Sequence, residues 1–175
     1  MPVRAINHGE GADAGRHRQS LYQRCIAQYN EALGAEFYIE AVAIVESLLC
    51  DRLESRLAAL HGQEENKRRF STLGRVACEL KGQRLGEPAD TRGIYGEISK
   101  WASQRNKVIH QLVKLEEGEI PNWDDRYKQA RRTAEAGMDL FRRLDRVLKA
   151  LTASFTSHVD PLMAGTSLQT KDIDG

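Results

Sequence analysis

Three residues near the middle of the chain combine side chains that can act on a phosphodiester. They are Arg105, Asn106 directly after it, and His110 farther along the same segment. Arginine is permanently cationic and its planar guanidinium matches phosphate oxygens. Histidine takes and gives a proton near neutral pH. Together they could cleave a phosphodiester without a metal ion or any other cofactor, and Lys107 between them is a candidate contact for the substrate backbone.

The three residues fall in a segment, residues 91–115, whose apolar positions recur at helical spacing. Since a helix advances about 100° per residue, one stripe contains Ile94, Ile98, Trp101, Arg105, Val108 and Leu112. The arginine interrupts this apolar row, where an unpaired guanidinium would be costly. Either the helix is distorted there, or the stripe faces an interface or cleft instead of a sealed core.

The same geometry separates the two reactive side chains. Arg105 and His110 lie about 140° apart on a regular helix, so one straight helix does not bring both to a common phosphate. A symmetric dimer that packs this helix against its twin would let the two chains line one shared cleft. The sequence therefore predicts a site that depends on a homodimer or on a distorted turn.

The spacing of arginine and histidine carries little information alone, because Arg56 and His61 repeat it. Arg56 has no asparagine after it and ends a charged segment, so we interpret it as part of a solvated face. A non-catalytic interpretation also stays open for the central motif. Its arginine would then pair with a carboxylate such as Glu97 or Glu116, its histidine would be merely exposed, and the domain would be a helical dimerisation or interaction module.

The segments around the motif are also helical in pattern. The first two are residues 20–33, which Gly34 ends or bends, and residues 35–61. A short helix with Leu73, Val76 and Leu80 follows them, and Asn122 or Asp124 caps the last helix. The segment 35–61 is apolar over so wide an arc that we expect it at the centre of a bundle. Mostly short connections and no alternating strand pattern predict an all-α fold, an up-and-down bundle of four to five helices. We expect one domain at residues 20–155, with mobile tails at residues 1–19 and 156–175.

Composition narrows the class of protein. The chain has 175 residues and a net charge of +1, so any nucleic-acid contact must come from a local patch. Cys25, Cys50 and Cys78 are widely spaced and odd in number, which indicates free thiols and predicts neither a disulfide framework nor a metal site. No apolar run has the length of a signal peptide or a membrane span. We therefore expect a soluble cytoplasmic protein that does not engage a membrane.

Weaker signals for nucleic acid lie elsewhere in the chain. Trp101 and Trp123 could stack on bases, although a tryptophan on an apolar stripe, as Trp101 is, more often belongs to the core. Residues 126–132 form a basic run that could follow phosphates. Acidic residues are interleaved with that run and the rest of its helix, which favours intrahelical ion pairs on a solvated face.

The motif Arg105-Asn106-x-x-x-His110, late in a helical bundle of this size, resembles the HEPN superfamily. The family motif is an arginine, four to six residues, and a histidine, often with a polar residue directly after the arginine. A long preceding helix with acidic positions, here Glu40, Glu46 and Asp51, is similar as well. The motif match is short, and the architectural similarity covers about residues 20–155.

The resemblance implies a small, usually dimeric α-helical domain with metal-independent endoribonuclease activity, in a toxin, abortive-infection protein or antiviral defence effector. RNA is then the substrate, His110 the general base or acid, Arg105 the stabiliser of the phosphoryl charge, and Asn106 a phosphate contact or a group that orients the imidazole. Glu46 or Glu40 would orient Arg105 or His110, and the alternative for both is an ordinary charge on a helix surface. A toxin of this kind is held in check by an antitoxin or another inhibitor protein.

The chain departs from one branch of the family. In the branch paired with a nucleotidyltransferase antitoxin, a tyrosine that receives the modification follows the histidine by two residues. Here Gln111 and Leu112 follow His110, so that tyrosine is absent and the sequence does not support regulation by that chemistry.

Overall fold

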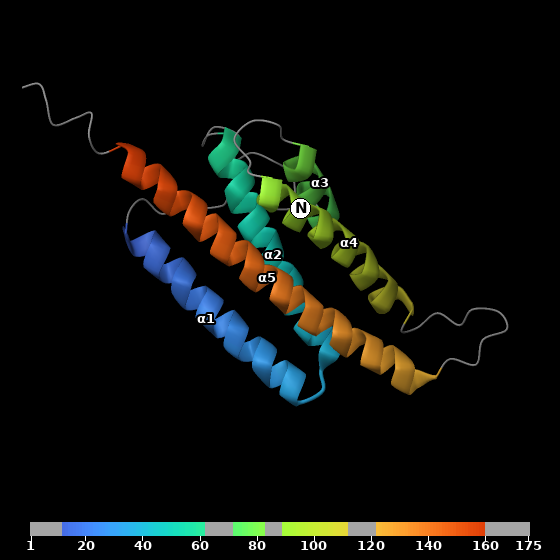
Figure 1. Ribbon diagram of the computed structural model, residues 1–175. Helices are drawn as coiled ribbons and strands as arrows, with labels where there is room; N and C mark the ends of the chain where they lie inside the picture. The colour runs from blue at the N-terminus through green and yellow to red at the C-terminus, as the bar shows by residue number, and fades with distance from the viewer. Residues whose placement is uncertain (1–11, 62–71, 83–88, 112–121, 160–175) are drawn as a thin grey trace, which may run out of the picture.

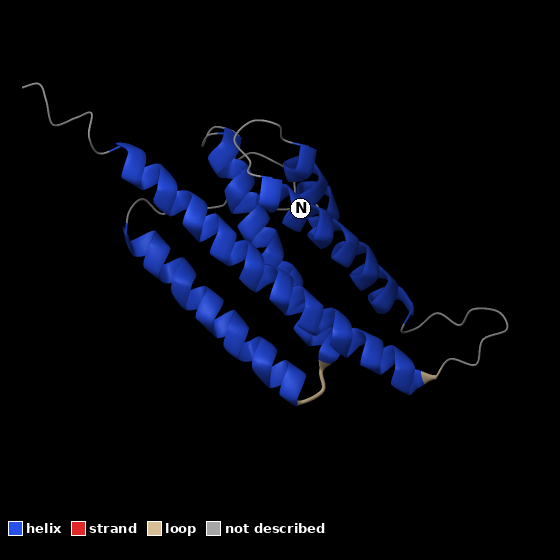
Figure 2. Ribbon diagram, in the orientation of Figure 1, coloured by secondary structure: helices blue, strands red, loops and turns tan. Residues whose placement is uncertain are grey.

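The computed structural model describes residues 12–61, 72–82, 89–111 and 122–159. Within these ranges the chain forms five α-helices and no strand (Figures 1 and 2). The helices are α1 (Ala12–Gly34), α2 (Tyr38–His61), α3 (Leu73–Gly82), α4 (Ala89–Gln111) and α5 (Trp123–Val159). The all-α helical bundle expected from the sequence is confirmed. No described helix combines the length and apolarity that a bilayer crossing requires.

Two helices are longer than predicted. The first begins at Ala12, so residues 12–19, which the composition assigned to a tail, are helical. The last runs to Val159, past the predicted domain boundary at residue 155. Of the two proposed caps of α5, Asn122 is the one that acts, because its Oδ1 accepts a hydrogen bond of 3.1 Å from the backbone N–H of Asp124.

The helices α2 and α5 run side by side in the same direction. Their first halves meet where the rings of Tyr38 and Tyr127 lie 4.9 Å apart, and their second halves meet at an ion pair between Arg52 and Asp145. The neighbouring α1 and α4 run the opposite way, and the short α3 packs against α2 and α4 (Figure 1). The central place that the apolar pattern predicted for residues 35–61 is confirmed, since α2 contacts each of the other four helices.

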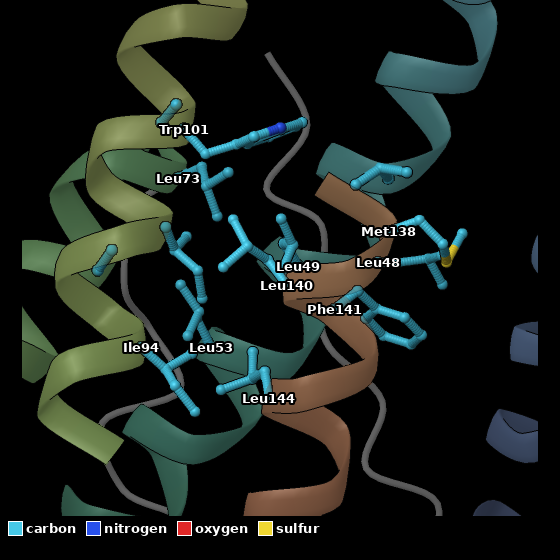
Figure 3. Close-up of a cluster of buried hydrophobic side chains, with 14 of the residues drawn as sticks. Leu48, Leu49, Leu53, Leu73, Ile94, Trp101, Met138, Leu140, Phe141 and Leu144 are labelled. Atoms are coloured by element: carbon cyan, nitrogen blue, oxygen red, sulfur yellow. The ribbon is translucent and has the colours of Figure 1, made fainter. Parts of the chain in front are cut away.

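The core is closest packed where α2, α4 and α5 cross. A Cβ added to Gly137 of α5 would lie 2.5 Å from Cζ2 of Trp101 and 2.6 Å from Cγ1 of Val45. The indole Nε1 of Trp101 donates a hydrogen bond of 2.8 Å to the carbonyl of Thr133, which satisfies its buried polar atom. Figure 3 shows side chains from these helices converging on this core. The crossing fixes the height of α4 against its two neighbours.

The turn from α1 to α2 does not depend on Gly34. The backbone N–H of Phe37 donates to the carbonyl of Ala32, and that of Glu36 donates to the carbonyl of Leu33. This is the Schellman pattern of a helix end, and it places Glu36 in the left-handed region at φ 63°. That conformation usually selects glycine, so the position of Gly34 indicated the end of α1 but not the residue that makes the turn.

Candidate functional site

The helix α4 carries the motif on a stripe that faces α2 and α5. Ile94, Ile98, Trp101 and Val108 of that stripe are buried, whereas Leu112 lies outside the described residues. Arg105 occurs between Trp101 and Val108, and its side chain keeps 19% of its surface exposed. The predicted stripe is therefore confirmed, with a guanidinium at the edge of the core.

The guanidinium is held from two sides. Its Nη2 forms an ion pair with Oε1 of Glu46 on α2, and its Nη1 donates a hydrogen bond of 2.7 Å to Oδ1 of Asn106. The third nitrogen, Nε, is buried and has no hydrogen-bond partner among the described residues. A carboxylate on the adjacent helix thus pairs with the cation in this row, while part of the guanidinium stays buried without a partner among the described residues.

Burial lowers the pKa of Arg105 from its ordinary value. An arginine nevertheless begins so far above neutrality that it stays protonated at physiological pH. The side chain is therefore a fixed cation whose hydration has been partly replaced by protein groups. A cation that is already desolvated and oriented can interact more strongly with a developing phosphoryl charge than one in bulk water.

The polar side chains that follow Arg105 on α4 face solvent. Asn106, Lys107 and His110 are all exposed on α4. Because Oδ1 of Asn106 accepts from the guanidinium, its Nδ2 group points its donors elsewhere. No contact among the described residues links the imidazole of His110 to Arg105.

The helix is regular through the motif, because every residue from Ala89 to Gln111 belongs to α4. The distorted turn, one of the two arrangements that the sequence allowed, is therefore not found in this segment, and the homodimer stays a prediction. The other expectation, that the two side chains lie on different faces of a straight helix, agrees with a half-buried Arg105 and an exposed His110.

The two supporting carboxylates differ. Glu46 reaches the motif directly through its ion pair with Arg105. Glu40 lies exposed in the first turn of α2, and no contact among the described residues joins it to Arg105 or His110. Asp51, the third acidic position on that helix, instead accepts a hydrogen bond from the hydroxyl of Tyr22.

The carboxylates that the sequence suggested as partners of Arg105 do not pair with it. Glu97 binds Arg143 of α5 through two hydrogen bonds of 2.7 and 2.8 Å, and Glu116 lies outside the described residues. The geometry explains the error, because Glu97 is two helical turns from Arg105 on α4, whereas Glu46 faces it from the next helix.

A second charged cluster, which the sequence did not indicate, joins α1, α2 and α5. The guanidinium of Arg52 lies 4.9 Å from the centre of the Tyr22 ring and pairs with Asp145. Asp145 also binds Lys149 at 2.8 Å, and Asp51 binds Tyr22. The sequence shows which of these residues lie close together within one helix. It does not show which residues of different helices are in contact. Asp51 also lies 3.7 Å from Nε of Arg18 on α1. Each of these charges therefore has an oppositely charged neighbour, which is typical of a structural network.

No group of three or more His, Cys, Asp or Glu side chains that could hold a metal ion occurs among the residues described. The three cysteines are free thiols at separate positions. Comparison of the chain with protein-family models, with curated proteins and with solved structures gives no match.

Proposed function

We propose that this chain is a metal-independent endoribonuclease of the HEPN type that acts as a toxin or antiviral defence effector. The observation that carries the proposal is the placement of Arg105. It is a fixed, partly desolvated cation in an apolar row of α4, held by Glu46 and Asn106. An arginine prepared in this way suits a phosphoryl group that gains negative charge.

The reaction is attack of a ribose 2′-hydroxyl on the adjacent phosphate. The bond between O2′ and phosphorus forms as the bond between phosphorus and O5′ breaks, which leaves a 2′,3′-cyclic phosphate and a 5′-hydroxyl. His110 takes the proton from the 2′-hydroxyl or gives one to the departing 5′-oxygen, and water supplies or takes the other proton. Arg105 stabilises the five-coordinate phosphorus, and the free Nδ2 donors of Asn106 bind a phosphate oxygen.

The regular helix sets a condition on this mechanism. Within one chain Arg105 is turned toward α2, through its ion pair with Glu46, and His110 toward solvent. We therefore propose a homodimer formed through α4, in which the histidine of one protomer and the arginine of the other act on the same phosphate. RNA is the substrate, and an inhibitor protein that covers α4 would restrain the activity.

The test uses the purified full chain with structured and unstructured RNA in EDTA. We expect the wild type to cleave and both Arg105→Ala and His110→Ala to lose at least about a hundredfold in rate. His61→Ala is the matched control, because His61 is also an exposed histidine in the last turn of a helix and follows Arg56 at the same spacing. Its rate should be unchanged.

Several results would contradict the nuclease. Equal cleavage by the wild type and the two motif variants would indicate contamination. Cleavage of a strand that carries deoxyribose at the scissile position would exclude attack by the 2′-hydroxyl.

Growth arrest on expression, relieved by His110→Ala, would support the toxin assignment.

A second candidate is a non-catalytic helical interaction module. The ion pair between Arg105 and Glu46 favours it, because it gives the arginine a role in joining α2 to α4 that needs no substrate. In such a module His110→Ala would leave both RNA binding and RNA cleavage assays unchanged. Arg105→Ala would lower only the free energy of unfolding. The two motif variants therefore separate the candidates.

A further inference from the structure

Two large apolar side chains at one end of the bundle are not used by the core. Phe37 is 59% exposed and Trp123 is 56% exposed. Phe37 directly precedes α2, and Trp123 is the first residue of α5. The turn between α1 and α2 and the beginning of α5 lie at the same end of the bundle (Figure 1). The other tryptophan, Trp101, is buried and hydrogen-bonded, so only one of the two tryptophans is free to meet a ligand.

Trp123 belongs to an ordered aromatic group with Tyr127 and Tyr38. The rings of Trp123 and Tyr127 are stacked, with centroids 5.9 Å apart and an interplanar angle of 26°. Tyr127 in turn lies edge-on to Tyr38 at 4.9 Å. Its hydroxyl donates a hydrogen bond of 2.6 Å to the carbonyl of Glu36, the left-handed residue directly before Phe37. The turn and the ring stack therefore hold each other in place.

This aromatic group is continuous with the helix that carries the motif. Tyr38 packs with Val108 of α4 and Ala130 of α5 in a small apolar cluster, against which Tyr127 also packs. Val108 follows Arg105 on the same stripe of α4 by less than one helical turn. The aromatic group therefore lies about one helical turn beyond Arg105 along α4.

The charges around the rings favour bases over a dense row of phosphates. Exposed cations on both helices, Lys107 and Lys128, suit an anionic strand. In the first turn of α5, however, Asp124 and Asp125 lie next to Trp123, and Oδ2 of Asp125 accepts a hydrogen bond from Asn122. Glu36 and Glu40 are also exposed at this end, so the cations are matched by carboxylates and the flat faces of the rings are the main binding feature.

We propose that Trp123, held in place by Tyr127, and Phe37 form a stacking platform for unpaired bases of single-stranded RNA. The inference rests on the proposed ribonuclease function and names its substrate class, RNA whose bases are free to stack. Stacking of a base on an aromatic side chain accepts every base. The platform therefore selects strands by the absence of pairing and not by sequence.

The test is binding of an unstructured 2′-O-methyl oligonucleotide, which lacks the attacking hydroxyl and cannot be cleaved. Trp123→Ala should weaken binding about 5- to 100-fold, the range for loss of one stacked base. Trp123→Phe should stay within about threefold of the wild type, because a flat ring remains. Leu21→Ala is the matched control, since Leu21 is another exposed large apolar residue, on α1, at 47%.

A second readout comes from fluorescence. The oligonucleotide should quench the emission of the wild type, and Trp123→Phe should abolish that quenching, because Trp101 is only 2% exposed. The same sequence as a duplex should bind at least about tenfold more weakly.

The proposal is overturned if Trp123→Ala binds as the wild type does, if the wild type does not bind, or if the variant changes only the oligomeric state. Failure of the nuclease is distinguishable. If binding depends on Trp123 but the protein cleaves no RNA, the stacking platform is supported and the ribonuclease proposal is rejected. If the Trp123→Ala variant binds normally and still cleaves RNA, the ribonuclease is supported and the platform is rejected.

Discussion

The observed ion pair of Arg105 and its proposed role in catalysis compete for the same side chain. Its ion pair with Glu46 joins α4 to α2, and the proposed reaction needs the same guanidinium at a phosphate. The exposed part of the side chain and the Asn106 contact at Nη1 allow both, provided that the phosphate approaches from solvent. Glu46 then acts as a positioning residue that never touches the substrate.

Glu46→Gln tests whether the ion pair between Glu46 and Arg105 stabilises the fold. Removal of the carboxylate leaves a half-buried cation unpaired, and we expect the free energy of unfolding to fall by about 1–2 kcal/mol in urea titrations. The loss should be smaller than for a sealed ion pair, because the two side chains keep 19% and 24% of their surfaces exposed.

Glu40→Gln is the matched control, as Glu40 is an exposed glutamate on the same helix. It should stay within about 0.5 kcal/mol of the wild type. Arg105→Met should cost less in the Glu46→Gln background than in the wild type, because the uncompensated charge disappears. Equal costs in both backgrounds would show that the two side chains are not coupled.

At the scale of elements, the position of α4 depends on a contact that tolerates no added atom. Gly137 allows α5 to approach Trp101 and Val45 closely. We expect Gly137→Ala to lower the free energy of unfolding by about 2–3 kcal/mol, because the helices must move apart despite the better helix propensity of alanine.

Gly93→Ala on α4 provides the opposite case, since a Cβ there meets nothing within 4 Å. It should raise stability by about 0.5–1 kcal/mol through helix propensity alone. Thermal unfolding of both variants checks the pair. Similar shifts of the same sign would mean that the crossing at Gly137 is not tightly packed.

The contact between Glu97 and Arg143 joins α4 to α5 at the other side of the crossing. The hydrogen bond from Arg143 lowers the pKa of Glu97, so the folded protein binds this proton less tightly than the unfolded chain does. The contact therefore contributes stability above the ordinary glutamate pKa, and the contribution is lost as the pH falls through the lowered value. Both side chains are exposed, so we expect only about 0.5 kcal/mol.

Denaturant titrations of Glu97→Gln check this sign. The variant should be less stable than the wild type at pH 7, and the difference should disappear in acid, where Glu97 is protonated in both states. High salt should reduce the difference at pH 7. A difference that persisted unchanged in acid would mean that the substitution acts through packing.

How far the sequence predicted these features differs from helix to helix. Apolar spacing identified the buried stripe of α4 and the central position of α2, because periodicity reports which face of a helix is covered. It did not identify Glu46 as the partner of Arg105, because pairing between helices depends on their relative height. That height is set by contacts such as the one at Gly137, which has no side chain to form part of a pattern.

At the scale of the whole molecule, the proposed site is complete only between two chains. The regular α4 keeps Arg105 and His110 on different faces, and no other histidine in the described residues occurs on α4. Each chain thus supplies an oriented, partly desolvated cation, Arg105. On another face of α4 it supplies a side chain that can transfer a proton, His110. The dimer is therefore a requirement of the proposed chemistry and does not follow from apolar surface.

Mixing two inactive variants tests this requirement. Arg105→Ala and His110→Ala homodimers each lack one group at both sites. After subunit exchange at equal concentrations, half of the dimers are mixed, and each mixed dimer has one intact site of two if arginine and histidine come from different chains. Recovered RNA cleavage should therefore reach about a quarter of the wild-type rate. If both groups came from the same chain, no mixed dimer would contain an intact site, and the mixture would stay inactive.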